Sequence, residues 1–229
     1  MKRQLLFLLL CLGLTSGCAT TSYQRASATS VRMDETVKSL TQASRDLDTA
    51  VSSLNGLQGR TGSDLRQQYQ LFTKRVNLLV SREKQLIARQ NQLDAVSREY
   101  FSSWQDELKK FKSSDLKKKS RQRRLMTIDV YDRMFDALQV QQESYQLMLN
   151  DFADIRRYLG YDLTPDAVNS ISENIRKAND DSKSVQQKIT QAINELQRTP
   201  APTASEAASA PPPVNPPAAP QPPQPSGQK

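Results

Sequence analysis

The chain has 229 residues and a net charge of +8, and 24% of its side chains are charged. It contains no histidine, which removes the commonest general base, the usual transition-metal ligand and every catalytic triad that depends on His. No Walker-type or dinucleotide-binding glycine motif occurs either. The composition therefore argues against an enzyme, and we expect no cofactor and no metal.

Residues 1–17 have the features of a secretory signal peptide. A positively charged start is followed by an apolar run over residues 5–14, and small residues then lead directly to Cys18. The apolar run is too short for a membrane-spanning helix, which needs about 20 apolar residues. We expect this segment to be removed after export.

Residues 14–18 read Leu-Thr-Ser-Gly-Cys, which resembles the lipobox of bacterial lipoproteins. The resemblance implies cleavage before Cys18 and lipid modification of this residue, and the following Ala19 implies the outer membrane. Multiple acyl chains would anchor the protein firmly, because each buried methylene contributes about 0.8 kcal/mol. We expect the protein to face the periplasm from the outer membrane; an ordinary secretory signal with an incidental Cys is the alternative.

Residues 18–30 are small, polar and almost uncharged. This composition is typical of a flexible linker. We expect a lipidated tether that joins Cys18 to a folded domain over residues 31–198.

Four segments of this domain carry apolar residues at alternating spacings of three and four, which is typical of helices with coiled-coil packing. The expected core positions of the first two are Met33, Val37, Leu40, Ser44, Leu47, Val51 and Leu54, then Leu65, Tyr69, Phe72, Val76, Leu79, Glu83, Leu86, Gln90, Leu93, Val96, Tyr100, Trp104, Leu108 and Phe111. Those of the last two are Ile128, Tyr131, Phe135, Leu138, Gln142, Tyr145, Leu149, Phe152, Arg156 and Leu159, then Val168, Ile171, Ile175, Ala178, Ser182, Val185, Ile189, Ala192 and Leu196.

Local signals mark the ends of these helices. Gly56 and Gly160 end the first and the third, because glycine favours helix termini. Ser63 is the expected N-cap of the second helix. At the start of the fourth helix, Thr164 is the expected N-cap and Pro165 occupies the first helical position.

The expected helices differ in length. The second and third span about 45 to 50 residues, roughly 70 Å at 1.5 Å per residue, whereas the first (31–55) and the fourth (165–198) are shorter. Short connections make neighbouring helices antiparallel. We therefore predict an all-α fold, an elongated antiparallel helical bundle with coiled-coil-like packing and a projecting two-helix hairpin.

The segment at the turn of this hairpin, 109–124, is strongly basic. Its one acidic residue is Asp115, and Ser113-Ser114 is typical of a turn or helix cap. The nine basic residues, which form the candidate contact with a membrane or a partner, are Lys109, Lys110, Lys112, Lys117, Lys118, Lys119, Arg121, Arg123 and Arg124. Repulsion between these charges at one turn costs stability, which supports a functional role; a merely solvated charge run is the alternative.

The expected location restricts the partners of this basic segment. An exported lipoprotein does not routinely meet nucleic acid, so we expect anionic lipid headgroups or an envelope protein instead. The antiparallel arrangement directs the segment towards the end of the domain that is attached to Cys18. Each basic residue near an anionic surface would contribute about 1 kcal/mol.

Two further features have weaker functional signals. Phe101 lies off the packing stripe and is a candidate interfacial anchor. Asp129, Asp132 and Asp136 share a helix face, but Arg133 lies beside them, so a solvated face is a simpler interpretation than a cation site.

Residues 199–229 contain eleven of the twelve prolines. Such a composition cannot build a packed core, and we expect a disordered, extended tail. It is either a spacer or a docking site for a partner.

The patterns Tyr100-Phe101-x-x-Trp104-x-x-Glu107-Leu108 and Leu116-x-x-x-Ser120, within helical periodicity over residues 33–198, resemble the proteobacterial domain-of-unknown-function family numbered two-nine-five-nine. Members of that family are exported helical proteins, so the resemblance implies export and a helical fold. It implies no activity, cofactor or catalytic residue.

The sequence thus predicts a lipid-anchored periplasmic scaffold or adaptor without catalytic activity. A chaperone-like clamp, which would need an exposed apolar groove, is the first alternative. An envelope enzyme that uses Asp, Glu, Lys or Tyr side chains is the second.

Overall fold

The structure is a computed structural model that describes residues 22–200; the expected signal peptide, Cys18 and almost all of the Pro-rich tail lie outside the described residues. Within that range every element is helical: α1 (Ser22–Asn55), α2 (Gly62–Lys110), α3 (Ser114–Tyr161), α4 (Pro165–Ser170) and α5 (Ser172–Arg198). None of these described helices combines the length and the hydrophobicity that crossing a bilayer requires. The predicted all-α fold class is confirmed.

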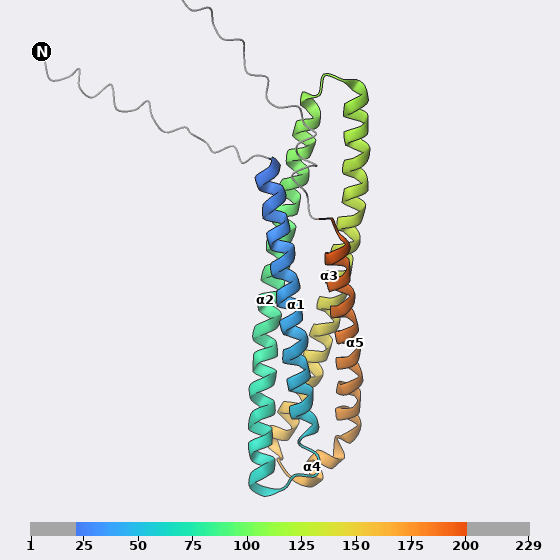
Figure 1. Ribbon diagram of the computed structural model, residues 1–229. Coiled ribbons are helices and arrows are strands. Elements are labelled where there is room, and N and C mark those ends of the chain that lie inside the picture. The colour runs from blue at the N-terminus through green and yellow to red at the C-terminus, as the bar shows by residue number, and fades with distance from the viewer. Residues whose placement is uncertain (1–21, 201–229) are drawn as a thin grey trace, which may run out of the picture.

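The four long helices run antiparallel to their neighbours, and the short α4 closes one end (Figure 1). α1 packs against α2, α2 against α3, α3 against α5, and α5 against α1, so the helices occupy the corners of a square. At the opposite end α2 and α3 extend beyond α1 and α5 as a hairpin (Figure 1). The predicted hairpin is therefore present, and we call residues 104–124 the tip.

The first helix begins earlier than predicted. Residues 22–30, which we expected to be a flexible tether, form the first turns of α1. Ala26 and Thr29 are buried there, and Ala26 lies seven residues before the buried Met33. The small residues that resemble a linker in composition therefore continue the packing repeat of the helix and let it lie close to α2.

The buried residues of α2 and α5 follow the predicted positions closely. In α1 and α3 some predicted positions are buried as expected and others are not. Several alternate positions of α1 and α3 differ by one residue, although Leu149 in the same series is buried as predicted. α1 buries Thr36, Ala43 and Ala50 where Val37, Ser44 and Val51 were expected. α3 buries Met134, Gln141 and Ile155 where Phe135, Gln142 and Arg156 were expected.

This difference has a geometric cause. Both sets of positions repeat every seven residues, and they differ only in which flank of the apolar face turns inward. Val37, Val51 and Phe135 remain partly buried against the core, so the face is wider than a single seam. The side on which the next helix lies decides the register, and that side is a property of the whole bundle.

Two polar pairs interrupt the core. Gln90 Nε2 donates to Gln141 Oε1 at 3.3 Å, and both side chains are buried. Arg82 Nε lies 2.8 Å from Asp46 Oδ2, and this ion pair between α1 and α2 is largely shielded from solvent. Polar pairs of this kind restrict which helix registers are compatible with a filled core.

The helix ends agree with the predictions in part. Thr164 Oγ1 accepts a hydrogen bond from the Ala167 N–H at 3.2 Å, so the predicted cap before Pro165 is confirmed. The predicted N-cap Ser63 instead lies inside α2, which begins at Gly62. The expected single helix over residues 165–198 is broken at Ile171, whose φ of −103° and ψ of 17° separate α4 from α5.

Candidate anionic-surface contact at the hairpin tip

The tip turns within three residues. α2 ends at Lys110 and α3 begins at Ser114, so residues 111–113 connect the two antiparallel helices. Ser113 is the N-cap of α3, and its Oγ accepts a hydrogen bond from the Leu116 N–H at 3.3 Å. This confirms the turn and cap that the sequence predicts, and the cap satisfies one of the free N–H groups at the helix start.

Side chains join the two helices of the tip. Trp104 Nε1 donates to Ser120 Oγ at 3.0 Å, and Arg124 Nε donates to the Phe101 carbonyl at 3.2 Å. The Trp104 ring lies edge-on to Tyr100, with 5.7 Å between ring centroids. These bonds give the tip a defined conformation although none of the other described helices packs against its end.

Phe101 is not the exposed anchor that we considered. Its side chain is half-buried, and its ring stands edge-on to Tyr131 with 5.0 Å between centroids. Phe101 lies off the main stripe of α2, on the flank that turns towards α3. Its position one residue beside Tyr100 therefore widens the apolar contact between the two helices.

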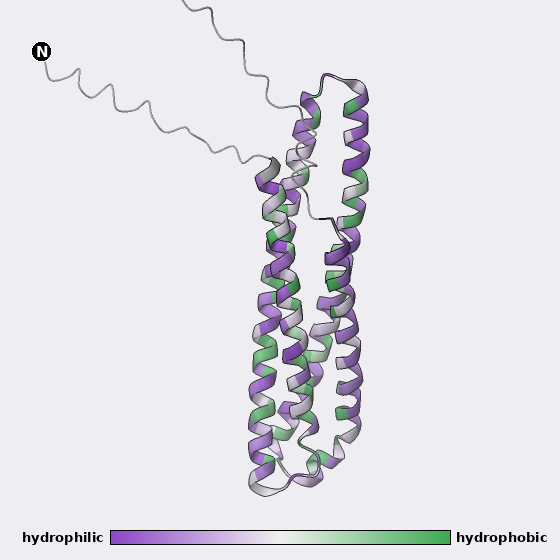
Figure 2. Cartoon of the chain, in the orientation of Figure 1, coloured by the Kyte–Doolittle hydropathy of each residue, from purple (hydrophilic) through white to green (hydrophobic). Residues whose placement is uncertain are grey.

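All nine predicted basic residues lie in the tip, from Lys109 at the end of α2 to Arg124 in α3. Seven have exposed side chains, and Lys117 and Arg124 are half-buried. Figure 2 shows mainly hydrophilic residues over this end of the hairpin, with hydrophobic positions between them. Arg124 differs from the others in role, because its bond to the Phe101 carbonyl holds α3 against α2.

Three of the basic residues have acidic neighbours on their own helix. The ion pairs are Lys109–Asp106 at 2.8 Å, Lys110–Glu107 at 2.7 Å and Lys119–Asp115 at 2.9 Å. The hydrogen bond from Lys109 is the main reason that the pKa of Asp106 lies below its ordinary value. Exposed pairs of this kind are weak and are screened by salt.

Four basic residues have no ion-pair partner in the described part of the chain: Lys112, Lys117, Lys118 and Arg121. Nine positive and three negative charges between residues 106 and 124 leave a net charge of +6. Leu116 is 49% exposed among them. The arrangement concentrates positive charge at one end of a long molecule, and its chemistry is electrostatic attraction of anions.

The acidic residues that follow the tip stand apart from it. Asp129, Asp132 and Asp136 are exposed along α3. Within residues 22–200, no group of three or more acidic, His or Cys side chains has the spacing to hold a metal ion. A shallow groove of about 450 Å³ below the tip is lined by Asp94, Arg98 and other residues of both charge signs, so it does not extend the positive surface.

Several of these features had no sequence signal of their own. The pairing of Trp104 with Ser120 and of Arg124 with the Phe101 backbone depends on how the two helices are rotated against each other. Ser120 is singled out by the family pattern alone, and Trp104 by that pattern and by its place among the expected core positions of the second helix. Cys18, the predicted lipidation site, lies outside the described residues, four positions before α1.

In a comparison with protein families, residues 21–199 match the family model described as "Protein of unknown function (DUF2959)". Searches of curated proteins and of solved structures found no match. The matched range begins and ends within one residue of the described helices, so the family corresponds to the helical domain with its tip.

Proposed function

This chain belongs to the DUF2959 family of proteins of unknown function, and we propose that it is a lipid-anchored scaffold or adaptor of the cell envelope that acts through its surfaces and not through catalysis. In this proposal the tip binds an anionic membrane surface. The observation that carries it is the group of four basic side chains at the projecting end of the bundle that have no ion-pair partner within residues 22–200: Lys112, Lys117, Lys118 and Arg121.

The charge of the tip supports an anionic partner. Basic residues close to an anionic bilayer contribute about 1 kcal/mol each, and the attraction decays within a Debye length of about 8 Å at physiological salt. The four unpaired side chains lie within ten residues around a single turn, so one flat surface can be near all of them. Leu116, exposed beside them, suits the apolar boundary below the headgroups.

The direction of α1 supports the same bilayer for the tip and for the lipid. Arg25, near the start of α1, is bonded to Ser103 Oγ at 2.7 Å, and α2 continues for only about two more turns. Ser22 therefore starts roughly 10 Å short of the end of α2. Three residues lie between Cys18 and Ser22, and the four Cα–Cα steps between them span at most about 14 Å. A bilayer that holds lipid at Cys18 is then within reach of the tip.

Vesicle co-sedimentation tests the tip. The full chain with Cys18→Ser, which cannot be lipidated, is mixed with neutral phosphatidylcholine vesicles or with vesicles that also contain an anionic phospholipid. We expect binding to the anionic vesicles alone, and we expect it to weaken as salt rises. Equal binding to both kinds of vesicle, or to neither, would refute the proposed contact.

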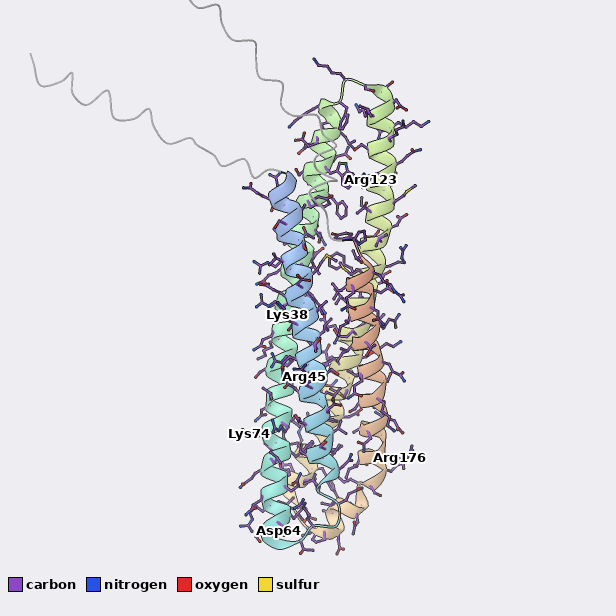
Figure 3. The ribbon with its side chains drawn as sticks, in the orientation of Figure 1. Lys38, Arg45, Asp64, Lys74, Arg123 and Arg176 are labelled. Atoms are coloured by element: carbon purple, nitrogen blue, oxygen red, sulfur yellow. The ribbon has the colours of Figure 1, made fainter. Side chains whose placement is uncertain are left out.

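A matched pair of variants separates the tip from net charge. The tip variant changes Lys112, Lys117, Lys118 and Arg121 to Gln. The control variant removes the same charge elsewhere by changing Lys38, Arg45, Arg66 and Lys74 to Gln, positions that are exposed along α1 and α2. Figure 3 labels Lys38, Arg45 and Lys74 on these helices. We expect the tip variant to lose binding to anionic vesicles and the control variant to keep most of it.

Membrane fractionation tests the anchor separately. The unchanged chain is expected to remain with the membrane fraction after a high-salt wash and to be released by detergent. Cys18→Ala is expected to enter the soluble fraction. If the Cys18→Ala chain fractionates like the unchanged chain, lipid at this residue is not the anchor, whatever the vesicle experiment shows.

A further inference from the structure

Exposed hydrophobic side chains gather on one face of α3. Nine large hydrophobic residues are exposed in the described part of the chain, and five of them lie on this face: Met126, Val140, Leu147, Tyr158 and Tyr161. Leu147 is 67% exposed and Tyr161 is 89% exposed. A row of exposed apolar side chains along one helix face is a candidate interaction surface.

Four of these residues are in a strict register. Met126, Val140, Leu147 and Tyr161 are separated by seven or fourteen positions, so they form a line along the helix. The buried residues of α3 repeat at the same interval, and the line therefore stays on one side of the bundle over its whole length. It runs beside the contact between α3 and α5.

The two remaining positions of this line are charged and exposed, Arg133 and Asp154. We call the six positions 126, 133, 140, 147, 154 and 161 the α3 stripe. Its order along the chain is Met, Arg, Val, Leu, Asp, Tyr. When two copies of the stripe run in opposite directions, each position of one copy faces a complementary residue of the other: Met faces Tyr, Arg faces Asp, and Val faces Leu.

We propose that two copies of the chain pair antiparallel along the α3 stripe, about a two-fold axis between residues 143 and 144. In this register Val140 of each copy lies against Leu147 of the other. Arg133 lies against Asp154, which places opposite charges together twice in the pair. A symmetric pairing of this kind uses the same surface on both copies and closes after two.

The residues at the two ends of the stripe are also complementary in this register. Met126 meets Tyr161, and a thioether beside an aromatic ring is a favourable contact. A parallel pairing in register would instead place Arg133 against Arg133 and Asp154 against Asp154. Because like charges at facing positions disfavour a helix pair, the stripe selects the antiparallel direction.

The flanks of the stripe agree with this register with one exception. In an antiparallel pair each flank faces its own equivalent, so Asp129 comes close to Arg157 and Val130 comes close to Tyr158. Near the axis Glu143 faces the Glu143 of the other copy. This single repulsive contact lies in solvent, because Glu143 is exposed and accepts a hydrogen bond only from Gln139 within its own helix.

A hollow beside the centre of the stripe offers space for the other copy. It has a volume of about 320 Å³ and lies between α3 and α5, where Leu147, Met148 and Val185 contribute its apolar lining. Lys177 closes one side through ion pairs with Asp151 at 2.6 Å and Asp181 at 2.8 Å. In the proposed register Val140 of the second copy approaches Leu147 at this hollow.

The pairing does not depend on the proposed membrane contact, but it has a consequence for it. The stripe covers about 53 Å of helix, and the two tips lie at opposite ends of the pair, roughly 95 Å apart. Two tips and two lipid anchors then reach one bilayer when the pair lies along its surface.

Charge reversal tests the pairing. Sedimentation velocity is measured over a concentration series on the full chain with Cys11→Ser and Cys18→Ser. We expect a reversible dimer that weakens at least about tenfold in Arg133→Asp and in Asp154→Arg, and that returns in the double variant. Lys74→Asp on α2 is the control and is expected to leave association unchanged. A monomer at every concentration, or a dimer that ignores both reversals, overturns the proposal.

Disulfide crosslinking tests the register in the same cysteine-free background. Copies with Val140→Cys are mixed with differently tagged copies with Leu147→Cys and oxidised gently. We expect crosslinks between the two tags, and fewer crosslinks when both copies carry Leu147→Cys. Preferential 147–147 crosslinking would indicate a parallel pair and would overturn the antiparallel assignment. A retained far-UV helix signal shows that each variant is folded.

Discussion

Trp104 Nε1 donates a hydrogen bond to Ser120 Oγ at 3.0 Å and thereby joins α2 to α3 inside the tip. The bond lies beyond the start of α1, where only two helices pack against each other. An isolated pair of helix ends has little apolar area to bury, so individual side-chain bonds carry more of its order than they do in the bundle. The shape of the basic surface therefore depends on this contact.

We expect Ser120→Ala to loosen the tip without unfolding the bundle. A net hydrogen bond contributes about 1 kcal/mol, and the half-buried indole N–H would lose its partner. Hydrogen exchange of amides 104–124 should accelerate by about fivefold, the factor that corresponds to 1 kcal/mol. Amides near Leu79 in the core should be unchanged; equal acceleration there would indicate that the tip and the bundle unfold together.

Breaking the ion pair Asp46–Arg82 should lower the free energy of unfolding strongly, whereas replacing both residues by apolar ones should lower it much less. Asp46→Asn leaves Arg82 as a shielded charge without its carboxylate, which should lower the free energy of unfolding by about 3 kcal/mol. The double variant Asp46→Leu with Arg82→Met should lose much less, because no charge remains to be desolvated. Urea unfolding of the unchanged chain, Asp46→Asn and the double variant measures both differences, and a loss in the double variant as large as that in Asp46→Asn would contradict this interpretation.

The buried pair Gln90–Gln141 is expected to lower the stability of the protein relative to an apolar pair. Gln141 Nε2 is buried without a hydrogen-bond partner in the described structure, although Gln141 Oε1 accepts from Gln90. Replacing both residues by Leu should raise the free energy of unfolding by about 1 kcal/mol. Gln90→Leu alone should destabilise the protein, because it removes the hydrogen bond that Gln90 Nε2 donates to the buried Gln141 Oε1. Thermal unfolding monitored by circular dichroism distinguishes the two results.

Glu83 gives a pH dependence. Partial burial raises its pKa above the ordinary 4.5, so the folded state holds this proton at higher pH than the unfolded state does. Stability from this group is therefore greatest below pH 4.5 and falls as pH rises through the raised pKa. Glu83→Gln should stabilise the protein at pH 7 relative to the unchanged chain.

The advantage of Glu83→Gln should shrink as pH falls towards 4, where Glu83 is mostly protonated in both states. Urea unfolding at the two pH values provides the comparison. A difference that is the same at both values would show that the substitution acts through packing and not through ionisation of the carboxyl.

The sequence by itself determined the helical architecture and the place of the basic turn. Repeats of three and four residues are local, and helices with an apolar face must bury it, so the long antiparallel helices and the hairpin followed from spacing and length. Thr164 and Ser113 act as caps because capping needs only the residues of one turn.

Only the tertiary structure decided which flank of each helix faces inward. Thr36 and Met134 are buried where Val37 and Phe135 were expected, because the position of neighbouring helices selects between two equally periodic registers. The arrangement of the helices also decided that residues 22–30 continue α1 and that Arg124 donates to the Phe101 carbonyl. It likewise decided that Met126, Val140, Leu147 and Tyr161 face solvent. Contacts between helices depend on their mutual rotation, and no single segment of the sequence contains that information.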